Sequence, residues 1–338
     1  MKAIDLNNKR VVISRTDSIG DVMLTLPLCA WIKENYPTAQ IVFLGKGYTR
    51  SVVESYVLVD HFEDWADYTE LSEAERRTKF ESLKVDVIIH VFPNKEIASL
   101  AKKVKIDVRI GTSHRAYHLL TCNHRPNFTR KRSDLHEAQL NHELLRPLGL
   151  DQIPSLAFII KATEHFQPKN AELPVGIQKS LDASSKSIVL HPKSQGSAKE
   201  WPMEKYIELA NALIAKGYTV FFTGTKAEGE LFSDALPEHK QLVDTTGQMS
   251  LEQLLSFISK VDTLCACSTG PLHIAGYLGV QTIGFFSPKR PIHPGRWRAL
   301  GSNVSILVND EGCEKCAQKQ DCGCIQSISV ERVLNEIA

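Results

Sequence analysis

Asp21 is the first residue of the sequence whose type and setting could do chemistry. It follows Gly20 in the stretch RTDSIGDVMLTLP (15–27), directly after an apolar, β-branched run. Glycine permits positive φ and lets a ligand approach the backbone closely. A carboxylate at such a strand-to-helix turn could act as a general base. It could equally cap the helix, because Asp accepts hydrogen bonds from the free amides of a helix N-terminus.

A second stretch, CSTGPLHIAGYLG (267–279), could bind an anion. Ser268, Thr269 and Gly270 form the turn between an apolar strand and a helix, and His273 falls in the first helical turn. Backbone amides and the positive end of the helix dipole at such a position suit a diphosphate. The simpler interpretations are that Ser268 is an ordinary helix cap and that His273 is a packed or surface histidine.

A third stretch, HPKSQGSAKEWP (191–202), is a loop rich in Lys, Ser and Gly between a strand and a helix. It could carry Lys199 to a phosphate, or Lys199 could be an ordinary surface lysine. The proline that ends the stretch marks the start of the helix, because proline is favoured in the first helical turn.

The composition is that of an ordinary soluble globular protein. Of 338 residues, 43% are hydrophobic and 23% charged, and 40 Lys and Arg stand against 39 Asp and Glu, so the net charge argues against a nucleic-acid partner. No apolar run approaches the roughly 18 residues that a membrane span needs, and the N-terminus lacks the apolar core of a signal peptide. We therefore expect a cytoplasmic protein, with peripheral contact to the inner membrane if its acceptor is lipid-linked.

Apolar, β-rich runs alternate with amphipathic helical runs along the chain, which is typical of doubly wound α/β units with parallel sheets. The pattern restarts after an irregular polar stretch, so we expect two Rossmann-like domains, 1–160 and 161–338, with a last helix that could pack back on the first. No GxGxxG fingerprint follows any strand, which argues against a dehydrogenase on this layout.

Positive charge is concentrated in one segment, residues 102–132, which holds nine Lys or Arg and a single acid, Asp107. Such a segment either meets an anionic partner or is only a solvated surface. Within it, Arg109, His114 and Arg115 are our candidates for an acceptor-binding role.

Four of the eight cysteines cluster in CEKCAQKQDCGC, at Cys313, Cys316, Cys322 and Cys324. Four thiols so close in sequence could hold a structural Zn²⁺, although the spacing is not that of a standard zinc ribbon. Free thiols or a disulfide are the alternatives, and disulfides are a poor default in a cytosolic chain.

Taken in order and at these separations, the three stretches closely resemble glycosyltransferase family 9, the heptosyltransferases of lipopolysaccharide core assembly. The resemblance runs from about residue 10 to about residue 335 and includes RIGTSHR (109–115) and the segment LLRPLGL (144–150). It implies the GT-B fold, in which two Rossmann-like domains face a central cleft. The N-terminal domain would hold the acceptor and the C-terminal domain a nucleotide sugar.

The resemblance also assigns roles to individual residues. Asp21 matches the catalytic carboxylate, and Lys199 matches the lysine that contacts the donor phosphates. The full set of predicted donor-binding residues is Ser194, Lys199, Thr223, Gly224, Ser268, Thr269, Gly270 and His273. The sequence departs from the family where the usual Asp is replaced by Ser268, which puts the identity of the sugar in question.

The implied reaction is inverting and needs no metal ion or cofactor. Asp21 would take a proton from the acceptor hydroxyl as it attacks C1 of the donor sugar. Lys199 and the helix start at 268–273 would stabilise the departing nucleoside diphosphate. We expect transfer of a heptose from ADP-heptose to an anionic lipopolysaccharide-core or related glycan acceptor. The alternatives are another nucleotide sugar, or a nucleotide-sugar-binding protein with little turnover.

Overall fold

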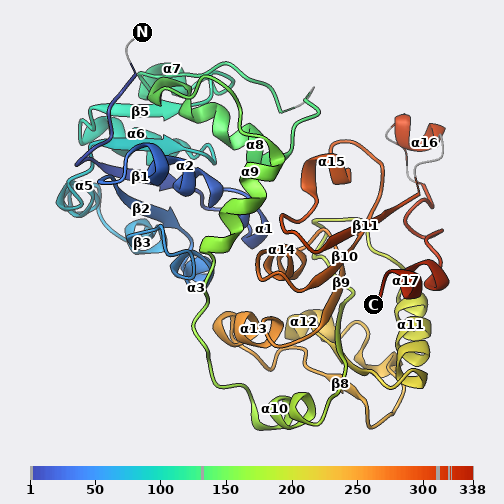
Figure 1. Cartoon of the computed structure of the whole chain (residues 1–338). Helices are drawn as coiled ribbons and strands as arrows, with labels where there is room; N and C mark the ends of the chain where they lie inside the picture. Colours follow the sequence, from blue (N-terminus) through green and yellow to red (C-terminus); the bar gives the residue numbers. More distant parts are fainter. Residues whose placement is uncertain (1–2, 131–132, 310–312, 319, 321, 338) are drawn as a thin grey trace. The chain divides into compact units, whose positions relative to one another are not determined.

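The computed structural model describes residues 3–130, 133–309, 313–318, 320 and 322–337. The chain forms two compact units, Met1–Gln167 and Pro168–Ala338. This division lies slightly beyond the boundary between 160 and 161 that the sequence suggested. Each unit is built around one parallel β-sheet (Figure 1).

The sheet of unit 1 has the strand order β3-β2-β1-β4-β5. Its strands are β1 (Arg10–Ser14), β2 (Gln40–Gly45), β3 (His61–Asp64), β4 (Val87–His90) and β5 (Val108–Gly111). The helices of this unit are α1 (Ile19–Met23), α2 (Pro27–Asn35), η1 (Gly47–Thr49), α3 (Arg50–Glu54), α4 (Ala66–Thr69), α5 (Glu73–Ser82), α6 (Lys95–Lys103), α7 (His118–Thr121), α8 (Glu137–His142), η2 (Glu143–Leu148), α9 (Leu156–Lys161) and η3 (Ala162–His165).

The sheet of unit 2 has the order β11-β10-β9-β6-β7-β8. Its strands are β6 (Ser187–His191), β7 (Thr219–Phe222), β8 (Leu242–Asp244), β9 (Thr263–Cys267), β10 (Gln281–Phe286) and β11 (Val304–Val308). The helices of this unit are α10 (Val175–Asp182), α11 (Met203–Ala215), α12 (Lys226–Gly229), η4 (Ser233–Ala235), α13 (Leu251–Ile258), α14 (Gly270–Tyr277), α15 (Pro294–Trp297), α16 (Glu314–Ala317) and α17 (Val330–Glu336).

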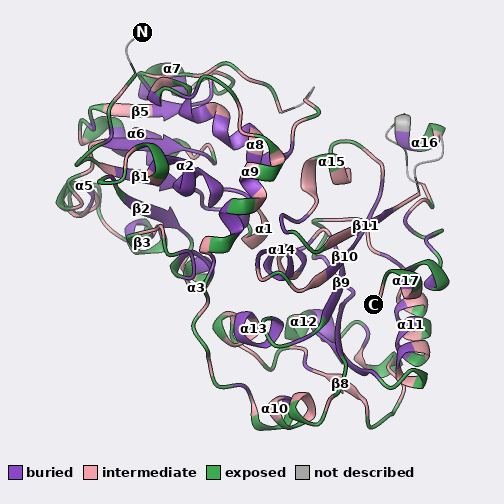
Figure 2. Ribbon diagram, viewed as in Figure 1, coloured by how far each residue is buried: buried purple, intermediate pink, exposed green. Residues whose placement is uncertain are grey.

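The central strands are buried along their whole length, because both faces of each sheet are covered (Figure 2). The continuously apolar sequences of β4, β6 and β9 therefore predict their positions well. The edge strands β3 and β8 are only four and three residues long, and neither was predicted from the sequence. Each pairs with a neighbour that was predicted, β2 and β7.

One helical run of the sequence becomes two helices. The segment that contains Pro27 reads as a single helix, but α1 ends at Met23 and α2 begins at Pro27. Proline has no amide hydrogen and cannot donate within a helix, so it is placed at a helix start. The break makes the short α1, which contains Asp21, a separate element.

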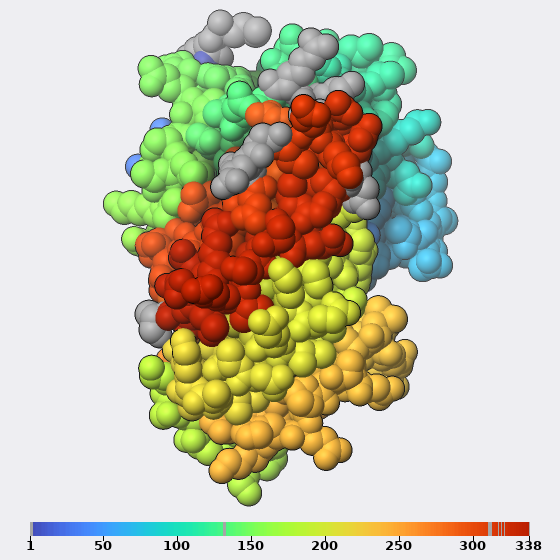
Figure 3. Space-filling view, turned by 90° about the vertical axis from the view of Figure 1, so that its right-hand side faces the viewer, coloured from blue at the N-terminus to red at the C-terminus, as the bar shows by residue number. Residues whose placement is uncertain are grey.

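The core of unit 2 joins its sheet to the chain's last helix. Trp201 is 1% exposed, lies 4.6 Å from the ring of Phe285, and donates from Nε1 to the carbonyl of Ile328 at 3.0 Å. Val330 and Val333 of α17 belong to the same apolar cluster. Figure 3 shows the surface of α17 (red) beside that of α11 (yellow). From the sequence, we expected that the last helix could pack back on the first domain. In the structure, α17 packs in the core of unit 2 instead.

Two leucines test this description of the core. Leu213 of α11 is fully buried, whereas Leu231 is 71% exposed. We expect Leu213→Ala to lower the free energy of unfolding of unit 2 by about 2–5 kcal/mol, because it removes buried methyl groups and leaves a cavity. Leu231→Ala should change it by less than about 0.5 kcal/mol. Urea unfolding followed by circular dichroism measures both, and equal effects of the two substitutions would contradict the assignment.

Candidate active site

Asp21 lies in the first turn of α1, at the carboxyl edge of the unit 1 sheet. Ser18 holds the N-cap position, so the interpretation of Asp21 as the cap itself is wrong. The Asp21 Oδ2 atom instead accepts a hydrogen bond from Ser18 Oγ at 2.5 Å. Its Oδ1 atom pairs with the guanidinium of Arg15. The side chain keeps 20% of its surface exposed, so the carboxylate is held in place and still accessible.

Arg15 is the residue that fixes this loop. It directly follows β1 and is only 4% exposed, and it also pairs with Asp17 Oδ1 at 2.7 Å. Burial lowers the pKa of Arg15, but the charges of Asp17 and Asp21 outweigh burial and raise it. The arginine therefore stays a cation. A buried cation needs such partners, since an unpaired charge is costly to remove from water.

Asp17 is the second carboxylate on this arginine. Burial raises its pKa to about 6, against the lowering effect of Arg15, and the charge of Asp21 adds to the rise. The backbone carbonyl of Asp17 accepts a hydrogen bond from the hydroxyl of Tyr48 at 2.7 Å. The tyrosine side chain is 53% exposed and so forms part of the accessible surface beside the loop.

His90 is a second candidate base at the same edge of the sheet, but its setting makes it a poor one. It is the last residue of β4 and is 1% exposed, and neither ring nitrogen has a hydrogen-bond partner. Burial, together with the charges of His118 and Arg109, lowers the pKa of His90 to about 3. Asp21 is thus the better placed proton acceptor of the two.

The basic segment 102–132 is not one free cationic face. The guanidinium of Arg109 donates to the carbonyls of Thr121 and Ile106 within its own unit. Arg130 pairs with the buried Glu137 at 2.8 Å. Two of the counted cations, Lys131 and Arg132, lie outside the described residues.

Two of the acceptor candidates differ from Arg109 in their setting. His114 and Arg115 are exposed in the loop that follows β5. They are therefore better placed than Arg109 to meet an acceptor. For all three residues the acceptor role stays a prediction.

In unit 2, the predicted donor residues follow three neighbouring strands, β9, β6 and β7. Because the carboxyl ends of parallel strands meet at one edge of a sheet, the loops after them lie together. The predicted residues in these loops are Ser268, Thr269 and Gly270 after β9, Ser194 and Lys199 after β6, and Thr223 and Gly224 after β7. The structure thus brings to one edge the stretches that the sequence singled out, while their contacts with a donor stay a prediction.

The turn after β9 presents a helix start. Helix α14 begins at Gly270, and the N-cap Thr269 makes no side-chain hydrogen bond to the helix amides. Its hydroxyl instead donates to the carbonyl of Cys267 at 3.2 Å. The amides of the first turn are therefore not satisfied by the cap, which suits an anionic ligand. His273 follows in α14 and is 2% exposed.

Glu200 organises the loop after β6, and the sequence did not single it out. Its Oε1 atom accepts hydrogen bonds from the amide of Ser194 at 2.9 Å and from the Ser194 hydroxyl at 3.0 Å. Its Oε2 atom pairs with Lys193 at 3.1 Å. Next along the chain, the amide of Trp201 donates to Cys267 Sγ at 3.3 Å, which ties this loop to the end of β9.

Thr223 and Gly224 form the tight start of the loop after β7. The carbonyl of Thr223 is hydrogen-bonded to the Nδ1 atom of His191 at 3.1 Å. Burial lowers the pKa of His191, so this imidazole is neutral near pH 7. A Cβ atom on Gly224 would come within 3.3 Å of Glu228, so a larger residue would crowd the helix that follows.

The predicted cysteine cluster forms as well. The four Sγ atoms of Cys313, Cys316, Cys322 and Cys324 lie within 4.8 Å of one another, close enough to hold a metal ion. Among the described residues, no helix is both long and apolar enough to cross a membrane.

Four residues of the site were not predicted from the sequence: Arg15, Asp17, His191 and Glu200. The signal for Arg15 was present, because a charged residue at the end of an otherwise buried strand needs a local partner. The hydrogen bonds of Glu200 and His191 connect segments that the sequence alone does not bring together.

Known proteins bear out the resemblance. The model of glycosyltransferase family 9 (heptosyltransferase) matches residues 80–324. A lipopolysaccharide core heptosyltransferase of Haemophilus influenzae is 24% identical over an alignment of 326 positions, which covers 92% of this chain and 87% of that protein.

Solved structures show the same fold. A family 9 glycosyltransferase from Veillonella parvula has a TM-score of 0.75 at 20% identity and covers 99% of this chain and 97% of its own. The Escherichia coli ADP-heptose lipopolysaccharide heptosyltransferase II has a TM-score of 0.72 at 18% identity, with 97% of both chains covered. The predicted GT-B class, with two parallel-sheet α/β domains, is confirmed. Because the family model matches more than half of the chain, the protein belongs to glycosyltransferase family 9, the heptosyltransferase family, and is a glycosyltransferase.

Proposed function

We propose that the protein transfers a heptose from ADP-heptose to a lipopolysaccharide-core or related glycan acceptor, with inversion at the anomeric carbon. The observation that carries the proposal is the Asp21 carboxylate, which Arg15 and Ser18 hold at the carboxyl edge of the unit 1 sheet. The donor and acceptor classes follow from the relatives, whose names specify ADP-heptose and the lipopolysaccharide core.

In the proposed mechanism, Asp21 accepts the proton of the acceptor hydroxyl as that oxygen attacks C1 of the sugar. A positioned carboxylate base fits a single displacement, in which the nucleophile is deprotonated on the face opposite the leaving group. Arg15 keeps the carboxylate oriented. Ser18 occupies the other carboxylate oxygen, at 2.5 Å.

The leaving group is a nucleoside diphosphate that gains negative charge as the bond breaks. We assign its stabilisation to the amides at the start of α14 and to Lys199, which follows the same edge of the unit 2 sheet. Fixed donors aimed at developing charge lower the barrier because they need no reorganisation during the reaction. The transfer so described uses no metal ion.

The acceptor would meet the exposed His114 and Arg115.

Asp21→Asn tests the catalytic role. The amide is nearly the same size as the carboxylate but cannot take the proton, so we expect kcat to fall by about 10²–10⁴-fold. Affinity for ADP, measured by calorimetry, should stay within about twofold, because the leaving diphosphate is assigned to the other unit. A matched control is Asp151→Asn, at an exposed position, which should leave both values unchanged. Full turnover in Asp21→Asn would remove the proposed base, and absence of turnover in the unaltered protein would favour a nucleotide-sugar-binding protein.

Asp17 generates a pH prediction. Because its pKa is about 6, Asp17 is protonated below pH 6. Above pH 6 it is an anion, and it then shares Arg15 with Asp21. Ionised Asp17 adds negative charge beside Asp21, which favours proton transfer to the base. We therefore expect kcat/KM to rise between pH 5 and pH 7 with an inflection near 6.

The variant Asp17→Asn should lose that inflection, because an amide does not titrate. The folding stability of the wild-type protein should change with pH in the direction opposite to kcat/KM. The folded-state pKa lies above the ordinary value of 3.8, so this contribution to stability is full below pH 3.8 and is lost as pH rises through about 6. An unchanged inflection in Asp17→Asn would show that another group controls the profile.

The identity of the donor is tested by thermal shift with a panel of nucleotide sugars. A donor at a hundred times its Kd stabilises the protein by about 2.7 kcal/mol, which is a measurable rise in Tm. We expect a rise with ADP-heptose and none with UDP-hexoses. The opposite result would replace heptose by another sugar and leave glycosyl transfer in place, which Ser268 in the usual Asp position makes a real alternative.

A further inference from the structure

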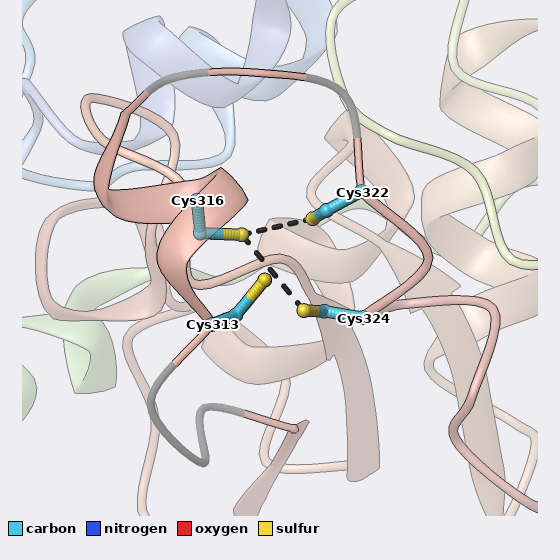
Figure 4. Close-up of side chains that lie close together, drawn as sticks. All are labelled: Cys313, Cys316, Cys322 and Cys324. Atoms are coloured by element: carbon cyan, nitrogen blue, oxygen red, sulfur yellow. Dashed lines mark hydrogen bonds between the residues drawn. The ribbon is translucent and has the colours of Figure 1, made fainter.

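The cysteine cluster of unit 2 has no part in the mechanism above. Cys313 precedes α16, Cys316 lies on it, and Cys322 and Cys324 follow in the loop, so that their thiols converge from both sides of one turn of chain (Figure 4). The Cys316 sulfur lies 2.8 Å from that of Cys322 and 3.9 Å from that of Cys324. All four sulfurs lie within 4.8 Å of one another.

The separation of 3.9 Å between Cys316 and Cys324 fits a tetrathiolate metal site, whereas the Cys316–Cys322 pair is closer together than a bound ion would hold it. Four thiolates placed tetrahedrally at about 2.3 Å from one metal ion have sulfurs about 3.8 Å apart. A disulfide would need about 2.05 Å between two of them. All four cysteines are free in this chain, so no disulfide explains why they gather.

Hydrophobic burial does not explain the gathering either. The other four cysteines, Cys29, Cys122, Cys265 and Cys267, are buried in the two units. Within the cluster only Cys316 is buried, and Cys313, Cys322 and Cys324 are half-buried. Partly exposed thiols gain little from meeting one another, whereas a shared metal ion would give them a strong reason to converge.

In the described part of the segment around the cluster, little else holds the chain in place. Between β11 and α17 its one helix, among the described residues, is the four-residue α16. The buried apolar side chains of Ile325 and Ile328 come only after the last cysteine in the sequence. Short segments without a core of their own are commonly stabilised by a metal ion or by disulfides.

The cluster lies next to the loop that follows β10. Cys316 Sγ is 4.0 Å from the hydroxyl of Ser287, the first residue after that strand. The same loop continues to Trp297, whose carbonyl lies 3.5 Å from the hydroxyl of Ser268. A metal ion at the cluster would therefore support one side of the loops at the proposed donor edge.

We propose that Cys313, Cys316, Cys322 and Cys324 bind one thiophilic metal ion, Zn²⁺ or iron, which holds α16 and the cysteines against the end of β10. Four protein ligands leave no open position, so the ion is structural and takes no part in the transfer. Only the supporting effect on the donor loops rests on the proposed function. Metal binding itself does not.

Metal content is the first test, and it uses the full-length protein purified without chelators. Elemental analysis should find about one equivalent of Zn or Fe per chain. An iron site would show sulfur-to-iron absorption in the visible spectrum, whereas a zinc site would be colourless until Co²⁺ replaces the ion. The double variant Cys313→Ser/Cys316→Ser should lose the metal, while the control Cys122→Ala should keep it. A metal-free wild-type protein that gains no Co²⁺ spectrum, or a double variant that keeps its metal, would overturn the proposal.

Limited proteolysis tests the structural role and stays informative if the double variant folds poorly. Removing the ion from the wild-type protein with a chelator should speed tryptic cleavage after Lys315 by about tenfold, because the segment loses its main constraint. Adding Zn²⁺ back should restore protection. Cleavage that is unaffected by the chelator would overturn the structural role. If the proposed donor is wrong, ADP-heptose will fail to bind, but the metal content and the protection of Lys315 will not change.

Discussion

The buried cation of Arg15 is the constraint on which the proposed catalytic loop depends. A guanidinium that is 4% exposed must be paired, and among the described residues Arg15 forms ion pairs with two nearby carboxylates, Asp17 and Asp21. The arginine needs the carboxylates at least as much as they need it, because a buried charge without a partner is strongly destabilising. The position of Asp21 is thus set by the electrostatics of a buried strand end, and the exposed fifth of its side chain is left for a substrate.

Unit 2 uses the same edge of its sheet but meets a different demand. Here the ligand would bring the negative charge, so the protein supplies amides and cations. The neighbouring order of β9, β6 and β7 gathers three loops, and the bond from Trp201 to Cys267 joins two of them. The neutral His191 secures the third by its contact with the carbonyl of Thr223. A parallel sheet brings such loops together without further contacts, because the carboxyl ends of all its strands lie at the same edge.

The sequence predicts the elements whose patterns are strong and local. The apolar strand β2 can be predicted from its own residues, because a continuous apolar run is typical of a buried parallel strand. Strands β3 and β8 were missed because their partners, not their own residues, make them strands. The same limit applies to the site.

Asp21 and the Ser268 turn could be found from sequence because glycine and helix-start signals stand beside them. The hydrogen bond from Arg109 to the carbonyl of Thr121 could not be found in this way, because Thr121 lies 12 residues further along the chain. The cysteine cluster could be foreseen as a group, because all four residues lie within one short segment. Its closeness to Ser287 could not, because Cys316 is 29 residues away along the chain.

Glu200 places a carboxylate in a loop that we assign to an anion, and an uncompensated carboxylate there would oppose diphosphate binding. Its contacts resolve the conflict. One oxygen is occupied by the amide and hydroxyl of Ser194, and the other by Lys193 at 3.1 Å. A carboxylate so compensated contributes little net field at a ligand, whereas the amides at the start of α14 keep their polarity. The acid therefore shapes the loop that carries Lys199 without cancelling the positive charge that a leaving diphosphate requires.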